Sequence, residues 1–275
     1  MQQIIPISHR RKVTISETDW QARRPALGDW RWMGMPIALL LLILGWQAIA
    51  ILGNYQAFIL PSPLLVVERF AATANSGLLW THTWATLRAT LVGFGLALCI
   101  GLMIGYVLAH TTWLERSLAP LLAASQAVPI VAIAPLIILW FGAGLQAKIL
   151  VAALITFFPV LINTIVALRG IPRELREMAL ISGASRWQML RYVELPLALP
   201  VLFGGIRTGL ALATTGAVVG EFVAGREGLG ALINIARGLF DTPLIFVALV
   251  TLAGITLSFY VLASLLERVL VRWEI

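Results

Sequence analysis

Charged side chains are scarce in this sequence: Asp, Glu, Lys and Arg together make up only 12% of its 275 residues. A soluble domain usually carries about 25% charged residues, because its surface must face water. Here 60% of the residues are hydrophobic. A chain with so little charge must place apolar side chains against lipid. The length suits one membrane domain and leaves no room for a second large soluble domain.

Residues that carry catalytic chemistry are also missing. Cysteine occurs once, as Cys99 in an apolar segment, so no disulfide forms within the chain and Cys99 is expected to be a packing residue. No phosphate-binding Gly-x-x-x-x-Gly-Lys-Ser/Thr run is present. His82 and His110 are separated by a full apolar segment, which argues against a metal site made from them. No nucleophile and acid–base cluster lies at membrane depth, so we expect neither an enzyme nor a bound cofactor.

The net charge of +7 would suggest nucleic acid as a partner of a soluble protein. Here the basic residues lie mostly in short segments between apolar runs, which favours membrane topology over nucleic-acid binding. The glycine cluster Gly225, Gly228 and Gly230 lacks the strand and helix context of a nucleotide-binding fingerprint. We therefore predict neither nucleic acid nor nucleotide as a ligand of this chain.

Six apolar segments approach the roughly 20 residues that a helix needs to cross a bilayer. They are residues 34–52, 86–109, 118–141, 149–168, 197–222 and 244–266. The third contains Pro129 and Pro135, and the fourth contains Pro159, which predicts kinks. The fold class we predict is an all-α, polytopic membrane protein with about six transmembrane helices.

The basic residues predict the orientation of these helices, because cytoplasmic loops are enriched in Lys and Arg. One set of segments carries Arg10, Arg11, Lys12, Arg23, Arg24, Arg31, Arg116, Arg169, Arg173, Arg176, Arg186, Arg191, Arg268 and Arg272. The other set carries Arg69, Arg88, Lys148, Arg226 and Arg237. Both termini are therefore expected in the cytoplasm. We divide the chain into a polar cytoplasmic tail, residues 1–31, which is no cleavable signal, and a transmembrane domain, residues 32–275.

Two segments carry small residues at every fourth position, a spacing that lets helix backbones approach closely. They are Gly93, Ala97, Gly101 and Gly105 in the second, and Gly205, Gly209, Ala213 and Ala217 in the fifth. Packing within one subunit is favoured over a seam between two subunits. In the outer loop 53–85, a short amphipathic helix is expected after Pro63. In the outer loop 223–243, the glycines predict a tight, irregular turn.

The cytoplasmic loop 169–196 is too polar to span a membrane and too patterned for a slack linker. Pro172 suits the first turn of one helix, and Gly183 suits the left-handed residue that ends it. Ser185 with Gln188 forms a capping-box pattern that begins a second helix, which Pro196 is expected to stop. The loop therefore predicts two short helices at a glycine elbow. Such an elbow either rests in lipid headgroups or docks onto a soluble partner.

The same loop carries a specific motif: Glu177-Met-Ala179, three residues, Gly183, nine residues, and Val193-Glu-Leu195-Pro196. It resembles the EAA loop of binding-protein-dependent ABC importer permeases, whose pattern is E-A-A, three residues, G, nine residues, I-x-L-P. Met178 replaces the middle alanine and Val193 replaces the isoleucine. Leu60-Pro-Ser-Pro63, Trp140-Phe-Gly142 and Gly228-Leu-Gly230 look like the nitrate, sulfonate and taurine permeases, and like hydroxymethylpyrimidine and riboflavin permeases. This resemblance does not extend to the tail, residues 1–31.

This resemblance implies that the elbow couples the permease to a separate ATPase. Glu177 would pair with a basic residue of the ATPase, Ala179 would keep the contact face small, and Gly183 would make the turn. Leu195 and Pro196 complete the motif. The alternative for Glu177 is a solvated charge paired with Arg173.

The partners implied by the resemblance are two ABC ATPase subunits, which bind ATP and Mg, an extracytoplasmic solute-binding protein and a second permease copy in a homodimer. The location implied is the bacterial cytoplasmic (inner) membrane.

Two ionisable residues lie within or at the end of the fifth segment, where charge is costly and often functional. Arg207 and Glu221 are therefore possible pathway or gate residues, although a structural role is favoured for each.

A stand-alone channel or ion-coupled secondary carrier is the alternative function, but no clear internal repeat is present. The permeases of vitamin importers with a small substrate-capturing subunit carry an Ala-Arg-Gly-like motif that this loop lacks.

The substrate stays open among three classes. They are a sulfonate or taurine, nitrate or bicarbonate, and a heteroaromatic vitamin or precursor such as riboflavin or hydroxymethylpyrimidine.

Overall fold

The computed structural model describes residues 31–271, and every regular element in that range is a helix. The α-helices are α2 (Arg31–Leu52), α3 (Pro63–Asn75), α4 (Leu78–His110), α5 (Thr112–Gln126), α6 (Ile130–Phe141), α7 (Leu145–Arg169), α8 (Arg173–Ile181), α9 (Arg186–Met189), α10 (Leu195–Ala224), α11 (Leu229–Gly238) and α12 (Thr242–Leu270). A π-helical segment, Leu190–Glu194, joins α9 to α10. The prediction of an all-α protein is confirmed. The tail 1–31 lies, apart from Arg31, outside the described residues.

The chain divides into two units, Met1–Ile49 and Ala50–Ile275. The first unit contains most of α2, whose apolar part is Pro36–Leu52. That stretch is shorter than the roughly 20 residues that a span usually needs. All the other helices belong to the second unit.

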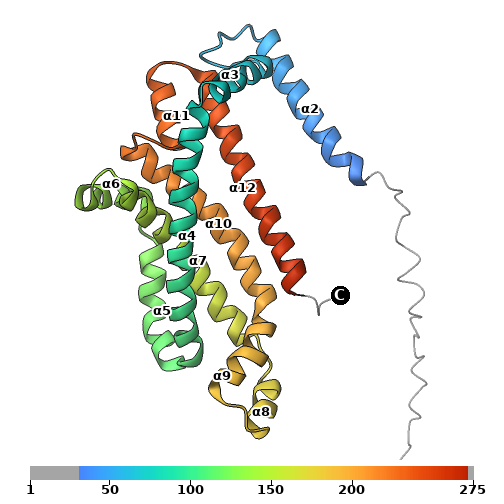
Figure 1. Ribbon diagram of the computed structural model, residues 1–275, viewed down its shortest axis with the longest axis vertical. Helices are drawn as coiled ribbons and strands as arrows, with labels where there is room; N and C mark the ends of the chain where they lie inside the picture. Colours follow the sequence, from blue (N-terminus) through green and yellow to red (C-terminus); the bar gives the residue numbers. More distant parts are fainter. Residues whose placement is uncertain (1–30, 272–275) are drawn as a thin grey trace, which may run out of the picture. The chain divides into compact units, whose positions relative to one another are not determined.

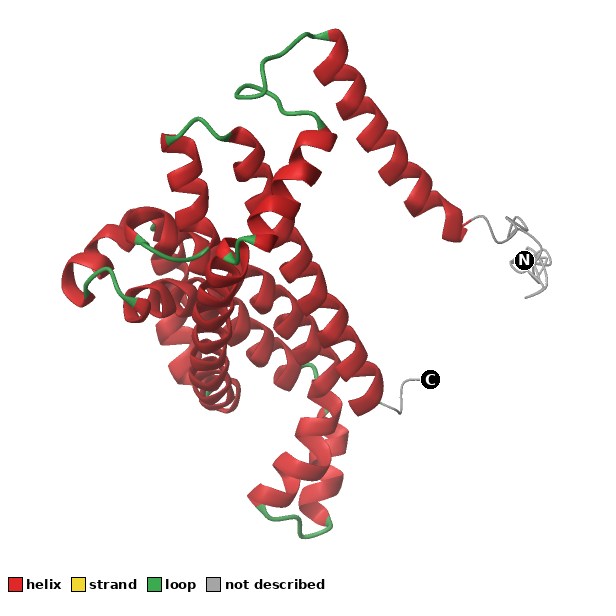
Figure 2. Cartoon of the chain, turned by 45° about the horizontal axis from the view of Figure 1, so that its top comes forward, coloured by secondary structure: helices red, strands yellow, loops and turns green. Residues whose placement is uncertain are grey.

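In the second unit, α4, α7 and α10 pack against one another, and α12 packs along α10. Figure 1 and Figure 2 show these long helices running side by side. α3 and α11 lie at one end of this group, and α8 and α9 lie at the other, as Figure 1 shows. We call these the α11 end and the elbow end.

The glycines of α4 explain how closely α4 and α7 approach. A Cβ added at Gly93 would lie 2.6 Å from the Cβ of Ala152, and one at Gly101 would lie 2.8 Å from Val160 Cγ1. A Cβ at Gly105 would lie 2.7 Å from Thr164. Each of these neighbours belongs to α7, so the small residues of α4 serve packing within one subunit, as predicted. In α10, a Cβ at Gly205 would meet Asn163 of α7 at 2.8 Å.

Four helices are long and apolar enough to cross a membrane: α4, α7, α10 with the segment leading into it, and α12. A fifth crossing results if α5 and α6 together form one broken span, since they meet at an angle of 88°. The break ends at Pro129, whose missing N–H cannot continue a helix from α5. Pro135, in contrast, lies inside α6. The predicted count of six spans is therefore not confirmed among residues 31–271.

At the α11 end, the predicted helix after Pro63 is present as α3. The prediction of only an irregular turn in residues 223–243 is wrong, because ten of these residues form α11. The turn itself occupies the few residues before α11, where Gly228 has a φ of +117°. An ion pair between Arg69 of α3 and Asp241, the N-cap of α12, joins the elements of this end.

Candidate functional site

The chain between α7 and α10 folds into two short helices joined by a tight turn, which we call the elbow (residues 173–189; Figure 1). Gly183 makes the turn with a φ of +77°, a conformation that favours glycine. Ser185 Oγ accepts the N–H of Gln188 (3.3 Å), and the N–H of Ser185 donates to Gln188 Oε1 (2.8 Å). The predicted glycine elbow and the capping box are both confirmed.

The two prolines that flank the elbow differ from their predicted roles. Pro172 is the N-cap residue of α8 and precedes the first turn. Pro196 does not stop the second helix, because the chain stays helical from α9 through the π-helical segment into α10. Pro196 lies in the first turn of α10, where a missing N–H is tolerated. Just before it, the N–H of Leu195 donates to the carbonyl of Leu190, five residues back, as in a π-helical turn. α9 is therefore a direct extension of α10.

The elbow exposes apolar side chains. Met178 is 64% exposed, Ile181 87% and Trp187 65%. Glu177 is also exposed, and no ion pair joins it to Arg173 within the described part of the chain. Ala179 is partly buried on the same helix. Exposed apolar groups beside a carboxylate make this face suited to docking a protein surface.

A cluster of charged side chains lies where the elbow meets the long helices. The carboxylate of Glu194 is 2.9 Å from His110 Nε2 and 3.3 Å from Arg176 Nη2. Glu194 is only 1% exposed. His110 ends α4, Arg176 is on the elbow helix α8, and Glu194 is the last residue before α10. We call these three residues the Glu194 cluster.

Arg207, a predicted pathway or gate residue, connects α10 to α12. Its guanidinium is 2.6 Å from the carboxylate of Glu267 and lies 5.8 Å from the ring centroid of Tyr260. The Nε of Arg207 also donates to the carbonyl of Phe203 (3.4 Å). These contacts give Arg207 a structural role in holding the two helices together, and its role in a gate stays a prediction.

Glu221, the second predicted pathway or gate residue, is fully buried near the α11 end. Its Oε2 accepts the hydroxyl of Thr86 (3.0 Å) and the N–H of Gly230 (3.0 Å). The Thr86 hydroxyl in turn accepts the N–H of Leu229 (2.8 Å). Glu221 thus fixes the start of α11 against α4 and α10. Its role in a gate also stays a prediction.

Further polar contacts surround the turn at Glu227 and Gly228 that precedes α11. His82 Nδ1 lies 2.8 Å from the carbonyl oxygen of Gly228 and 3.1 Å from its amide nitrogen. The buried Lys148 donates to the carbonyl of Glu227 (2.6 Å). Because His82 lies in the second turn of α4 and His110 ends this helix, the two histidines are held in separate contacts near its opposite ends.

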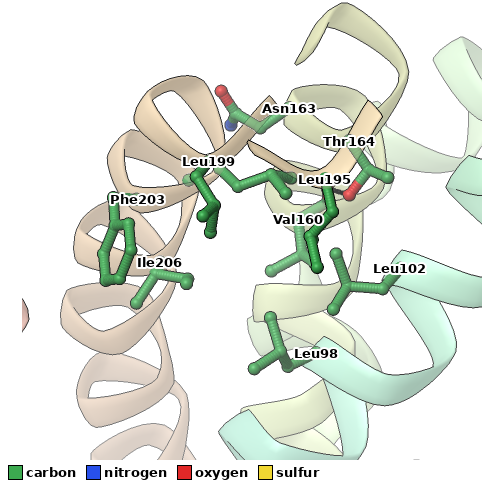
Figure 3. A pocket seen from close by; sticks show the side chains of 11 residues that line it. Leu98, Leu102, Val160, Asn163, Thr164, Leu195, Leu199, Phe203 and Ile206 are labelled. Carbon is green, nitrogen blue, oxygen red and sulfur yellow. Dashed lines mark hydrogen bonds between the residues drawn. The ribbon is translucent and has the colours of Figure 1, made fainter. Parts of the chain in front are cut away.

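A hollow of about 150 Å³ lies between α4, α7 and α10. Figure 3 shows Leu199, Phe203 and Ile206 of α10 facing Leu98 and Leu102 of α4, with α7 between them. Its two polar lining residues are bonded to their own helix: Asn163 donates to Pro159 O (2.8 Å) and Thr164 to Val160 O (2.7 Å). The hollow is therefore an apolar gap in the helix packing and not a polar binding site.

Reasoning from sequence missed the Glu194 cluster. Glu194 occupies the variable position of the Val-Glu-Leu-Pro motif, and nothing in the local pattern distinguishes a buried glutamate there from a solvated one. His110 lies 84 positions away in the chain. The only local signal was a histidine at the end of an apolar segment.

The family described as "Binding-protein-dependent transport system inner membrane component" matches residues 97–274 of this chain. The riboflavin transport system permease protein RibX of Chloroflexus aurantiacus is 70% identical over 246 residues, which cover 90% of this chain and 92% of that protein. The formylaminopyrimidine transport permease protein ThiX of Halalkalibacterium halodurans is 33% identical, covering 80% of this chain and 87% of that protein.

Among solved structures, a chain of the MetNI methionine ABC transporter in an inward-facing conformation is similar, with a TM-score of 0.64. The match covers 70% of this chain and 97% of that chain at 23% sequence identity. At that identity the likeness concerns the fold alone.

Proposed function

Because the chain belongs to the family of binding-protein-dependent transport system inner membrane components, the permeases of ABC importers, we propose that it forms the membrane pathway of a riboflavin importer. One observation carries the choice of substrate: the 70% identity to a riboflavin permease over 90% of this chain. Identity to the formylaminopyrimidine permease is 33%. Of the three substrate classes suggested by sequence, the heteroaromatic vitamins are therefore preferred. The family does not support a stand-alone channel or carrier.

The chain is a transport subunit without a nucleotide-binding motif, so energy must come from a partner. We propose that two ABC ATPase subunits, which bind ATP and Mg, dock on the elbows of two permease copies in a homodimer. The exposed Met178, Ile181 and Trp187 support docking at this surface. In this proposal Glu177 pairs with a basic residue of the ATPase, Ala179 keeps the contact close, and Gly183 fixes the turn. The chain itself binds no cofactor.

The remaining partner is an extracytoplasmic solute-binding protein, which delivers riboflavin to the α11 end. In this proposal the elbow end faces the cytoplasm, and both chain termini lie on that side if α2 also crosses the membrane. The distribution of Lys and Arg supports this orientation, since the elbow region carries Arg173, Arg176, Arg186 and Arg191. The location follows as the bacterial cytoplasmic membrane.

Uptake in bacteria tests the proposal. A strain that cannot make or import riboflavin is given this chain with its ATPase and binding protein, and uptake of labelled riboflavin and taurine is compared. We expect ATP-dependent uptake of riboflavin but not of taurine. Uptake of taurine without riboflavin would refute the substrate, and uptake that persists without the ATPase would refute the importer mechanism.

Glu177→Lys tests the elbow in the same assay. A lysine would repel the basic residue proposed on the ATPase, so we expect uptake to fall about tenfold or more and less ATPase to co-purify. Glu68→Lys, which makes the same charge change at an exposed position of α3, is the matched control and should retain the ATPase. Equal loss of the ATPase in both variants would contradict the proposed role of Glu177.

A further inference from the structure

We propose that Glu194 is a positioning residue that fastens the elbow to the membrane helices, so that movement of the elbow is passed on to α4 and α10. This inference rests on the proposed function, because it assumes that a partner ATPase moves the elbow. It concerns a residue outside the surface that the ATPase would contact. Glu194 acts through Arg176 and His110 and touches no substrate.

The two halves of the elbow are attached differently. α9 continues through the π-helical segment into α10 and must move with it. α8, in contrast, is joined to α9 only through the turn at Gly183, and none of its nine residues is buried. The side-chain bonds from α8 to residues outside the elbow come from Arg176. At its other end, α8 follows α7 after residues 170–172, of which Ile171 is buried. Without Arg176, α8 would keep only these two chain connections, and its Gly183 end could shift and absorb the movement.

The surroundings of Arg176 support this. One hollow of about 400 Å³ separates Leu175 and Met178 of α8 from Tyr192 and Pro196. A second hollow, of about 610 Å³, is lined by Tyr106, Leu180 and the members of the Glu194 cluster. The apolar side of α8 is therefore not packed tightly onto α10, and packing alone cannot hold it rigidly. The charged contact of Arg176 with Glu194, at the wall of the second hollow, supplies the attachment.

Glu194 is suited to this role by its burial and its bonds. Its Oε1 contacts both His110 and Arg176, while the guanidinium of Arg176 also donates to the carbonyl of Leu168 in α7 (2.6 Å). The Glu194 carboxylate thus joins α8 to the end of α4 and the start of α10. The bond from Arg176 to Leu168 also connects α8 to α7. Glu194 itself is shielded from water, whereas the side chains of His110 and Arg176 are 34% and 27% exposed. Charge-assisted bonds to a buried carboxylate are stronger than those between two solvated groups.

Both ring nitrogens of His110 face oxygen atoms, because Nδ1 lies 2.9 Å from the carbonyl of Tyr106 and Nε2 faces Glu194. A ring nitrogen that carries a proton donates to the oxygen it faces. The His110 ring and the Arg176 guanidinium thus meet at the same oxygen of one buried carboxylate, which favours its position between them. The rare π-helical turn that ends at Glu194 places this side chain there, and π-turns often occur at functional sites.

The chain offers a matched control. Arg169 of α7 and Glu115 of α5 form an ion pair of 2.5 Å, and Arg169 also donates to the carbonyl of Leu108. This pair lies at the same end of the long helices but includes no residue of the elbow. Glu115→Gln therefore removes a comparable charge contact without loosening α8.

The first measurement compares transport with ATP consumption. Wild type, Glu194→Gln and Glu115→Gln are each reconstituted into liposomes with the ATPase and binding protein. Riboflavin uptake and ATP hydrolysis are then measured together. For Glu194→Gln we expect uptake per ATP to fall about fivefold or more while hydrolysis stays within about twofold of wild type. Glu115→Gln should keep the wild-type ratio. Arg176→Lys, which keeps the charge but cannot reach two acceptors in the same way, should resemble Glu194→Gln.

The second measurement does not depend on the substrate. Spin labels are attached to Glu174→Cys in α8 and Thr208→Cys in α10, in a Cys99→Ala background diluted with unlabelled chain. Electron paramagnetic resonance then gives the distribution of distances between α8 and α10. We expect one narrow distribution, which Glu194→Gln broadens and Glu115→Gln does not.

The outcomes separate the two proposals. A wild type without ATP-dependent riboflavin uptake contradicts the proposed substrate, and the distance distributions then decide the role of Glu194. Unchanged distributions in Glu194→Gln and Arg176→Lys overturn the inference, as does an unchanged uptake per ATP in a transporting complex. If Glu194→Gln does not assemble, Arg176→Lys alone decides. If neither assembles, Glu194 serves folding and the inference is overturned.

Discussion

Glu194 and Glu221 flank most of α10, and both carboxylates are almost completely buried. Burying a charge is costly unless it is paired or well hydrogen-bonded. Glu194 has a guanidinium and an imidazole ring as partners, and Glu221 has a hydroxyl and a backbone N–H. In each case one partner is distant in the chain, His110 for Glu194 and Thr86 for Glu221, and the other lies in a nearby connecting segment. Each glutamate thus joins a short connecting segment to the long helices.

Gly228 offers a sharp test of the Glu221 contacts. An added Cβ would lie 2.0 Å from Glu221 Cδ, and the φ of +117° is one that other residues rarely adopt. We expect Gly228→Ala to lower the free energy of unfolding by about 2 kcal/mol or more, through overpacking and backbone strain. Thermal unfolding in detergent should show a lower midpoint.

The control is Gly95→Ala in α4, because nothing lies within 4 Å of a Cβ added at Gly95. It should leave the midpoint nearly unchanged. If both variants unfold like the wild type, the close approach of Gly228 and Glu221 is wrong.

At the scale of an element, substitutions at Gly183 show whether transport requires the fixed turn geometry of the elbow. Gly183 has a φ of +77° in open surroundings, so a side chain there meets strain but no clash. We expect Gly183→Ala to cost about 1 kcal/mol and to reduce uptake, whereas Gly183→Asn should be milder because asparagine tolerates this conformation better. Riboflavin uptake and ATPase co-purification measure both effects. The opposite order, with alanine the milder change, would show that backbone conformation does not limit the elbow.

How far an element could be predicted depended on how local its signals were. Gly183, Ser185 and Gln188 lie close together, and their pattern gave the elbow correctly. α11 was missed because Gly228 and Gly230 suggest a turn, although buried contacts with α4 and α10 stabilise a helix. Pro196 was misjudged because a π-helical turn has no clear sequence pattern. Glu194 could not be recognised because His110 is distant in sequence and the approach of Arg176 depends on how the elbow folds back on the long helices.

For the whole molecule, the family and the membrane helices follow from composition and one motif, while the substrate depended on a close relative. The sidedness of the molecule can be tested directly. In a Cys99→Ala background, Ile181→Cys lies on the elbow and is 87% exposed in the wild type, and Leu239→Cys follows α11 and is 70% exposed. A membrane-impermeant maleimide should label Ile181→Cys only in inverted vesicles and Leu239→Cys only in intact spheroplasts. The reverse pattern would invert the proposed orientation.

The π-helical segment has a consequence for the evolution of this chain. A π-turn holds one residue more than an α-turn, and in an α-helix each residue turns the chain by about 100°. Deleting one residue between Leu190 and Glu194 would therefore rotate α9, and the elbow with it, by roughly that angle around the axis of α10. Substitutions in this segment can change the direction of the elbow by small steps, whereas a change in the length of the segment rotates the elbow by a large angle at once. The direction in which the elbow points from α10 therefore depends on the number of residues in the π-helical segment. Relatives whose elbow points in the same direction should have a segment of the same length.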